Sequence, residues 1–341
     1  MANRYYVQFN AGLGELAVGA LHRDLPAARV VFQDDSAAII ESAAEPSQVA
    51  ALPYLTGSLL FLAGARRGPL AAVVPSLASQ LDRAGAAGRT PRRRPFRVVT
   101  SVDGALVALP PRARARLESA VAARTGGWVQ ARGSGEEYWV VGRRGLPDLL
   151  LGRRLAGRRA QQQGALGPEL ADLLVRASGP RPHDVFLDPF GGRGSIIWAR
   201  LRYPARRVIY SDTGYHELRR QFRPELARAR SAEFLSEDAR ALPSVADAAM
   251  DVIVTDPPWG EFRGPGAGQL ADFPEFAAGL AATMRRVLRR PAGRFVILIS
   301  RRQEENLRQA LADAGLVPAA AHRILVSGHP ATVLAGRTGH N

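Results

Sequence analysis

The stretch DVFLDPFGGRGSIIWAR, residues 184–200, runs from an apolar segment through a glycine-rich turn into a second apolar segment. The first segment predicts a buried strand ending at Asp188, and the second predicts a helix that begins near Ser195. Glycines let a backbone approach a ligand closely, and a helix N-terminus offers free N–H groups to an anion. The turn has neither the Lys-Ser/Thr pair of a P-loop nor the GxGxxG spacing of a dinucleotide site. It therefore predicts either a different kind of ligand-binding loop or a plain tight turn.

Strands and helices alternate on both sides of this turn. Before it, residues 167–178 predict an amphipathic helix. After it, apolar runs predict strands at 207–212, 232–235, 250–256 and 294–300, separated by helices from about 215, near 274–289 and at 304–315. This order predicts an α/β fold with a doubly wound, largely parallel sheet, whose ligands lie at the carboxyl ends of the strands.

Two acidic residues end or follow the next strands at that same edge. Asp212 stands where a carboxylate usually accepts hydrogen bonds from the two hydroxyls of a ribose, although it can instead cap the following helix. Asp238, followed by Ala239, comes after the third strand. Its carboxylate can accept a hydrogen bond from an adenine amine, and the alternative is an ordinary solvated acid.

The stretch DPPWG, residues 256–260, ends the fourth strand with a carboxylate, a stiff bend and an aromatic that looks exposed. The Asp256 carboxylate and the Pro257 carbonyl can accept hydrogen bonds from an exocyclic amine of a nucleobase. They would draw its nitrogen towards tetrahedral geometry and stabilise the positive charge that develops there. Pro258 keeps these acceptors rigid, and Trp259 offers a flat face to a flipped base. We interpret the motif as an amine clamp rather than a structural Pro-Pro turn.

The first 160 residues predict two small α+β units that differ in charge. Residues 1–63 carry 3 arginines against 6 acidic residues, whereas residues 64–160 carry 19 arginines against 6, a net charge of +13. Such an excess is typical of a polyanion-binding surface. The alternative is an arginine-rich surface without a partner, since all 46 basic residues of the chain are arginines. The candidates for phosphate contact are Arg92, Arg93, Arg94, Arg97, Arg153 and Arg154. For the first three, a disordered basic loop is an equal alternative.

The composition excludes several kinds of site. With no cysteine, the chain can form neither a disulfide nor a thiolate metal site. The six histidines lack metal-ligand spacing, so we expect no metal. We find no basic-then-apolar leader and no run of about 18 apolar residues. We therefore expect a cytoplasmic monomer that does not enter a membrane.

Taken in order, DPFGGRGSI, YSD, EDA and DPPWG resemble the motifs of the S-adenosylmethionine-dependent methyltransferases that modify exocyclic amines in nucleic acids. The glycine turn is similar to the D-P-F-C-G-S-G-T-I pattern of the tRNA and rRNA guanine-N2 methyltransferases, and DPPWG is similar to their D-P-P-Y-G. The first half is similar, more weakly, to a THUMP domain with its ferredoxin-like partner. The resemblance implies a Rossmann-like class I methyltransferase domain at 161–341. A ferredoxin-like unit at 1–63 and a THUMP-like RNA-binding domain at 64–160 would precede it.

The resemblance also implies the cofactor and the roles of the site residues. S-adenosylmethionine would donate a methyl group in line from its sulfonium to an exocyclic nitrogen, most simply N2 of a guanine in tRNA, without a metal or a covalent intermediate. Asp212 would hold the ribose, Asp238 with Ala239 the adenine, and residues 256–259 the target base. The methionine portion would be held by Asp188, Pro189, Phe190, Gly191, Gly192 and Gly194.

Two departures from the family pattern leave other functions open. Gly191 and Arg193 replace the usual Cys and Ser, and Trp259 replaces Tyr or Phe, which keeps a stacking face but loses a phenol. Because guanine N2 and adenine N6 need the same clamp, methylation of guanine in 23S rRNA, or of adenine N6 in RNA or DNA, is an alternative. A protein-glutamine methyltransferase would not need the basic unit. A non-catalytic RNA-binding protein on a methyltransferase fold is a further alternative, against which the intact Asp256 and glycine turn argue.

Overall fold

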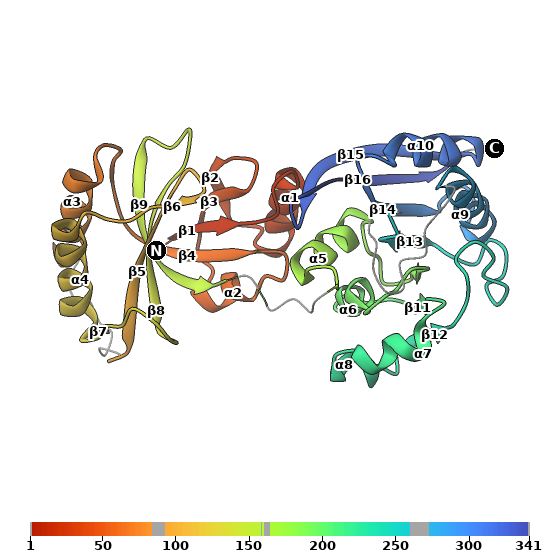
Figure 1. The fold of residues 1–341 in the computed structure, drawn as a ribbon, viewed down its shortest axis with the longest axis horizontal. Helices are drawn as coiled ribbons and strands as arrows, with labels where there is room; N and C mark the ends of the chain where they lie inside the picture. Colours follow the sequence, from red (N-terminus) through yellow and green to blue (C-terminus); the bar gives the residue numbers. More distant parts are fainter. Residues whose placement is uncertain (1, 84–92, 158, 160–163, 260–272, 340–341) are drawn as a thin grey trace. The chain divides into compact units, whose positions relative to one another are not determined.

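The computed structural model describes residues 2–83, 93–157, 159, 164–259 and 273–339 (Figure 1). The chain forms two compact units. The first unit comprises Met1–Gln8 and Leu21–Arg158, and the second comprises Phe9–Ala20 and Arg159–Asn341. Within the described residues, no helix combines the length and the apolar character that a membrane crossing requires.

The first unit is built on one mixed sheet with the order β2-β3-β1-β4-β9-β8-β5-β6, in which β7 also pairs with β5. β4 pairs antiparallel with both β1 and β9, so a single sheet runs through the two segments on either side of residue 63. The division into two units at that residue stays a prediction. The strands are β1 (Asn3–Gln8), β2 (Arg29–Gln33), β3 (Ala37–Ser42), β4 (Gly57–Arg66), β5 (Pro95–Val102), β6 (Ala105–Leu106), β7 (Trp128–Val129), β8 (Glu136–Gly142) and β9 (Asp148–Ala156).

Two long helices, α3 (Leu70–Arg83) and α4 (Pro111–Thr125), lie side by side in this unit (Figure 1). They share a buried cluster in which Leu77 and Leu117 are both fully buried. The sequence analysis does not predict α3, which contains Pro75. A proline inside a helix removes one backbone hydrogen bond, and here burial of one apolar face outweighs that loss. The other helices begun in this part of the chain are α1 (Gly14–Asp24) and α2 (Pro46–Ala51).

The second unit is built on a seven-stranded sheet with the order β12-β11-β10-β13-β14-β16-β15. The first five strands in this order are parallel, which confirms the predicted doubly wound arrangement. The order reverses between β10 and β13, and ligands of open α/β sheets bind at such a switch point. The strands are β10 (Val185–Asp188), β11 (Arg207–Ser211), β12 (Ala232–Leu235), β13 (Val252–Thr255), β14 (Arg294–Ser300), β15 (Leu316–Val326) and β16 (His329–Thr338).

The helix predicted from about residue 215 is broken into three short pieces. Phe222 and Arg223 are extended, and Arg223 precedes Pro224, which disfavours helical backbone in the residue before it. The remaining helices lie close to their predicted bounds. The helices of this unit are α5 (Pro168–Ala177), α6 (Ser195–Arg200), α7 (Tyr215–Leu218), the 3₁₀ helix η1 (Arg219–Gln221), α8 (Pro224–Ala227), α9 (Phe273–Val287) and α10 (Glu304–Asp313).

The sheet ends in an antiparallel hairpin, β15–β16, that the sequence analysis does not predict. Its first strand contains Pro318 followed by three alanines, residue types that are depleted in strands, so the middle of β15 gives no strand signal. Its turn, Ser327-Gly328, has positive φ at both residues, 51° and 87°. This geometry is that of a two-residue hairpin turn matched to strand twist.

Part of the arginine content of this unit is structural. Arg200 and Arg294 are 0% and 7% exposed, and both lie beside the buried carboxylate of Asp184. Arg294 also donates to the carbonyls of Ser178 and Gly179. A buried charge is tolerated only when it is paired and hydrogen-bonded. These two arginines therefore hold the fold together rather than contributing to a binding surface.

Candidate active site

Three acidic residues at the carboxyl ends of neighbouring parallel strands form the centre of the candidate site. Asp188 ends β10, Asp212 follows β11, and Asp256 follows β13. β10 pairs with both other strands, so the parallel registers place the three ends at one edge of the sheet. The negative charges of Asp256 and Asp212 both help to raise the pKa of Asp188, as expected for carboxylates that lie close together. The sequence analysis identifies all three.

The glycine turn between β10 and α6 is held by the strand beside it. The Gly191 N–H donates to the Ser211 carbonyl at 2.9 Å, and the Tyr210 hydroxyl donates to the Gly192 carbonyl at 2.8 Å. A Cβ at Gly191 would lie 2.1 Å from the Tyr210 ring, so only glycine fits there. Gly194 has φ +78°, and a Cβ there would lie 2.1 Å from Leu226. The glycines therefore allow both the turn and the packing of β11 and α8 against it.

The Asp188 side chain is 1% exposed, and only one of its two carboxylate oxygens accepts hydrogen bonds from the described residues. Its Oδ1 accepts from the Thr255 hydroxyl at 2.8 Å and from the Phe190 N–H at 3.2 Å. Its Oδ2 is buried and has no hydrogen-bond partner among the described residues. Burial is the main cause that raises the pKa of Asp188 to about 8, and the two donors oppose it. A buried carboxylate with a free oxygen is the group that a cationic ligand would satisfy.

Asp212 already makes two bonds to the backbone. Its Oδ2 accepts from the Gly192 N–H at 3.0 Å and its Oδ1 from the Gly214 N–H at 2.8 Å. The second bond is the local turn that the capping alternative predicts, and the first ties β11 to the glycine turn. Each carboxylate oxygen can accept a second hydrogen bond. The two predicted roles, turn formation and ribose binding, are therefore compatible.

The Asp238 side chain is 39% exposed and has a partner. Arg240 binds it through Nη2 at 2.6 Å and through its backbone N–H at 2.8 Å, and these bonds hold the pKa of Asp238 below its usual value. An adenine amine would share this carboxylate with Arg240. Ala239 is buried at 2% exposure next to it. The adenine-binding role of both residues stays a prediction.

The DPPW stretch departs from the prediction at its aromatic. Trp259 is only 8% exposed, and its indole N–H donates to Asp256 Oδ1 at 3.0 Å. The indole therefore orients the carboxylate of the motif, a role that the sequence analysis missed. Pro257 is buried and Pro258 exposed. Burial raises the pKa of Asp256 to about 7, while the indole donor lowers it. Its Oδ2 accepts no hydrogen bond from the residues described.

Two other residues of the site were also missed by the sequence analysis. Thr255 precedes Asp256 and links β13 to Asp188, and Tyr210 holds the glycine turn. In the sequence, both look like ordinary strand residues. Pro189 and Phe190, whose cofactor-binding role stays a prediction, lie within the turn, where the Phe190 ring packs against Phe276 of α9 with ring centroids 5.7 Å apart.

The arginines predicted to bind RNA differ in their surroundings. Arg93 and Arg94 are exposed, whereas Arg92 lies outside the described residues. The three others have carboxylate partners. Arg97 and Arg154 both bind Glu137, and Arg153 lies 3.7 Å from Glu136. Arg94, Arg153 and Arg154 line one groove of about 640 Å³ beside these glutamates.

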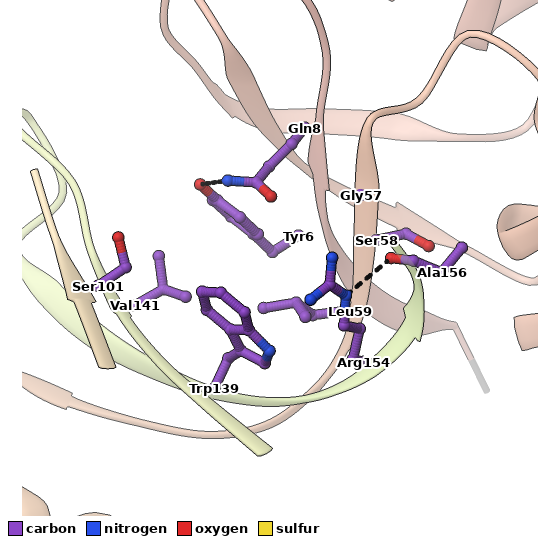
Figure 2. Close-up of a pocket in the computed structure, with 10 residues that line it drawn as sticks. All are labelled: Tyr6, Gln8, Gly57, Ser58, Leu59, Ser101, Trp139, Val141, Arg154 and Ala156. Carbon is purple, nitrogen blue, oxygen red and sulfur yellow. Dashed lines mark hydrogen bonds between the residues drawn. The ribbon is translucent and has the colours of Figure 1, made fainter. Parts of the chain in front are cut away.

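A second hollow in the same unit lies between Tyr6, Gln8, Trp139 and Arg154 (Figure 2). The Arg154 guanidinium lies over the Trp139 ring, 5.1 Å from its centroid. The hollow has a volume of about 10 Å³, which is the size of one water molecule. It is therefore a packed junction of the sheet and too small for a nucleobase.

Comparison with known proteins supports the fold. Residues 156–202 match a family model described as RMKL-like, methyltransferase domain. The crystal structure of TrmN from Thermus thermophilus superposes with a TM-score of 0.77 at 22% identity, covering 98% of this chain and 99% of that one. A possible methylase from Clostridium difficile 630 superposes with a TM-score of 0.70 at 12% identity, covering 100% and 99%. The chain has a methyltransferase fold.

The predicted class I methyltransferase fold is thus confirmed. A putative methyltransferase complexed with SAH superposes with a TM-score of 0.67 at 11% identity, covering 100% of this chain and 99% of that one. Among curated proteins, the tRNA (guanine(6)-N2)-methyltransferase of Thermus thermophilus is 33% identical over 181 residues. That alignment covers 52% of this chain and 50% of the relative, so the match spans about half the length of the curated protein.

Proposed function

We propose that this chain is an S-adenosylmethionine-dependent RNA methyltransferase that methylates N2 of a guanine in tRNA. The observation that carries the proposal is the position of Asp256 and the Pro-Pro bend at the switch point. They follow β13, which pairs with the strand that ends at Asp188, and Oδ2 of Asp188 has no hydrogen-bond partner among the described residues. The resemblance of the motifs and the name of the 33% identical relative support the substrate.

The residues at the switch point fit this cofactor. Asp188 Oδ2 is a buried acceptor without a partner among the described residues, which suits the ammonium group of a methionine moiety. Asp212 keeps one acceptor position on each oxygen for a ribose diol. S-adenosylmethionine, when bound, supplies an electrophilic methyl group on a sulfonium. A cluster of three carboxylates favours a ligand with such positive charge.

The clamp would act on the amine of the target base. Asp256 Oδ2 and the Pro257 carbonyl accept its two N–H groups, while the indole of Trp259 keeps Asp256 oriented from the other oxygen. The nitrogen lone pair is thereby freed for in-line attack, and the carboxylate stabilises the positive charge that forms. A pKa of about 7 also lets Asp256 hold the released proton for a time.

We further propose that residues 64–160 hold the RNA through its phosphates, in the manner of a THUMP-like domain. The exposed Arg93 and Arg94 are the strongest candidates, because no carboxylate is bound to them within the described part of the chain. Arg97, Arg153 and Arg154 can contribute only by sharing their charge with Glu136 and Glu137. Phosphate contacts of this kind position an RNA without reading its sequence.

The test is methyl transfer from labelled S-adenosylmethionine to total tRNA, rRNA and DNA in parallel, followed by nucleoside mass spectrometry. We expect N2-methylguanosine in the tRNA pool, and its loss in Asp256→Ala with cofactor binding intact. Label in rRNA, in adenine or in DNA would keep the clamp and overturn the substrate. If no pool is labelled although the cofactor binds, the catalytic proposal is wrong and a binding function replaces it.

A further inference from the structure

A short basic segment lies in the second unit and is not part of the basic region at 64–160. We define the basic segment as residues 215–230, which comprise α7, η1 and α8 and connect β11 to β12 (Figure 1). It contains two acidic residues, Glu217 and Glu225, and no exposed large apolar side chain. It contains five arginines: Arg219, Arg220, Arg223, Arg228 and Arg230.

The charge of this segment is not compensated locally. Four of the five arginines are exposed and Arg223 is half-buried. Among the residues that the structure describes, none of the five binds a carboxylate. Arginines just outside the segment differ in this respect, since Arg202 binds Asp172 at 3.2 Å and Arg207 binds Glu233 at 2.6 Å. The segment therefore presents guanidinium groups whose N–H donors are available to a partner.

One arginine of the segment is held in place by an aromatic ring. The Arg223 guanidinium lies over the ring of Trp198 on α6, 5.2 Å from its centroid, and Arg202 lies over the same ring at 6.0 Å. A guanidinium stacked on a ring keeps its N–H edge directed outward and loses less freedom when it binds. The half-buried indole of Trp198 thus pre-orients the N–H donors of Arg223 next to the glycine turn.

The apolar side of the segment packs on the glycine turn itself. Leu226 of α8 is fully buried against Gly194, and Phe222 packs on Tyr210 with ring centroids 5.5 Å apart. The same few residues therefore present cations on one side and support the cofactor turn on the other. A polyanion bound to the segment would lie beside the end of the sheet at which the transfer site is formed.

We propose that the basic segment is a second RNA-binding surface, which grips phosphates of the substrate RNA within the catalytic unit. The proposal rests on the proposed function, because RNA is the polyanion that such an enzyme must bring to Asp256. An acidic protein surface would match the charge, but protein interfaces commonly add buried apolar anchors, and this segment has no exposed one. Arginine-rich, apolar-poor surfaces suit phosphate contacts that are independent of sequence.

The test compares two triple variants of the full chain that remove the same charge. The first is Arg219→Gln, Arg220→Gln and Arg223→Gln, within the segment. The control is Arg302→Gln, Arg323→Gln and Arg337→Gln, three exposed arginines elsewhere in the same unit. Dissociation constants for unmodified tRNA are measured by fluorescence anisotropy between about 50 and 200 mM salt, the range in which phosphate contacts change affinity most clearly. S-adenosylmethionine affinity and thermal midpoint verify that both variants fold.

We expect the segment variant to bind tRNA at least about tenfold more weakly, and the slope of log affinity against log salt to fall by about 2 to 3, roughly one per phosphate contact. The control should stay within about twofold of the parent chain. Equal losses in both variants, or no loss in the segment variant, would overturn the proposal. If the parent methylates tRNA while the segment variant binds normally, only this inference fails. If the parent binds no RNA at all, it fails together with the RNA substrate.

Discussion

A methyl group added at Gly191 would overlap the ring of Tyr210, so the substitution Gly191→Ala tests the packing of the glycine turn. The Cβ of an alanine would lie 2.1 Å from two ring carbons of Tyr210 and 2.9 Å from a third. Ordinary contact begins at 3.4 Å, so the ring would have to retreat by about 1.3 Å (from 2.1 to 3.4 Å). φ at Gly191 is not in the left-handed region, so backbone strain adds nothing to this cost.

The ring of Tyr210 cannot retreat easily. It is fully buried, its hydroxyl donates to Gly192, and the rings of Phe222 and Phe234 lie 5.5 Å away. Overpacking a rigid core usually costs about 1–3 kcal/mol. We therefore expect Gly191→Ala to lower the free energy of unfolding by about 3 kcal/mol, at the upper end of this range, and to weaken cofactor binding.

A double-mutant cycle decides whether the overlap is the cause. Tyr210→Ala removes all three contacting ring atoms, and by itself should cost about 3–5 kcal/mol because it leaves a cavity. In that background, Gly191→Ala should cost less than about 1 kcal/mol, which gives a coupling of about 2 kcal/mol between the two positions. Urea unfolding at 25 °C measures all four free energies.

The control is Gly279→Ala, the same substitution on α9, where the new Cβ meets only the Arg240 side chain at an ordinary 3.6 Å. It should stabilise the chain by up to about 1 kcal/mol, since alanine favours a helix over glycine. Additive costs for Gly191→Ala and Tyr210→Ala would refute the packing argument. So would an unchanged stability of Gly191→Ala alone.

Three further predictions concern the acids of the site. Because the pKa of Asp256 is raised to about 7, kcat/KM for methyl transfer should rise nearly tenfold per pH unit below 7 and level off above about 8, as the carboxylate ionises; a flat profile from pH 5.5 to 8 would contradict this. Trp259→Phe removes the donor that lowers this pKa, so the midpoint of that profile should move to higher pH, whereas an unmoved midpoint would mean that the indole bond has no influence. Asp188 has a pKa of about 8, so cofactor affinity measured by calorimetry should increase from pH 6.5 to 8.5, and Asp188→Asn should weaken it by about 10- to 100-fold and abolish that pH dependence, with unchanged affinity as the contrary result.

Much of the candidate site was predictable because its acidic residues directly follow apolar strands in the sequence. Each acid of the site stands directly at or after an apolar strand, and parallel strands bring their carboxyl ends together. What the sequence could not show were side-chain partners from neighbouring strands. Tyr210 and Thr255 look like ordinary strand residues, and their roles exist only because β10 pairs with both β11 and β13. Trp259 is also buried and bonded to Asp256, a contact that no spacing predicts.

Helix α3 and strand β15, which the sequence analysis did not predict, were missed for a different reason. Helix α3 contains Pro75, and β15 contains Pro318 followed by three alanines, so at these positions local propensity opposes the structure that each element adopts. In both elements, tertiary packing outweighs local propensity. α3 buries Leu77 and Leu81 against the sheet of the first unit, and β15 pairs along its whole length with β16.

The arrangement of the arginines shows why net charge alone is a weak guide to a binding surface. The basic region at 64–160 has a net charge of +13, yet Arg97 and Arg154 both bind Glu137. The basic segment at 215–230 has a much smaller excess, but its arginines have no carboxylate partner among the residues described. A phosphate that approaches a paired arginine must compete with a carboxylate that is already in place, whereas an unpaired arginine offers its full charge. Substitution of the unpaired arginines should therefore change RNA affinity more per residue than substitution of the paired ones.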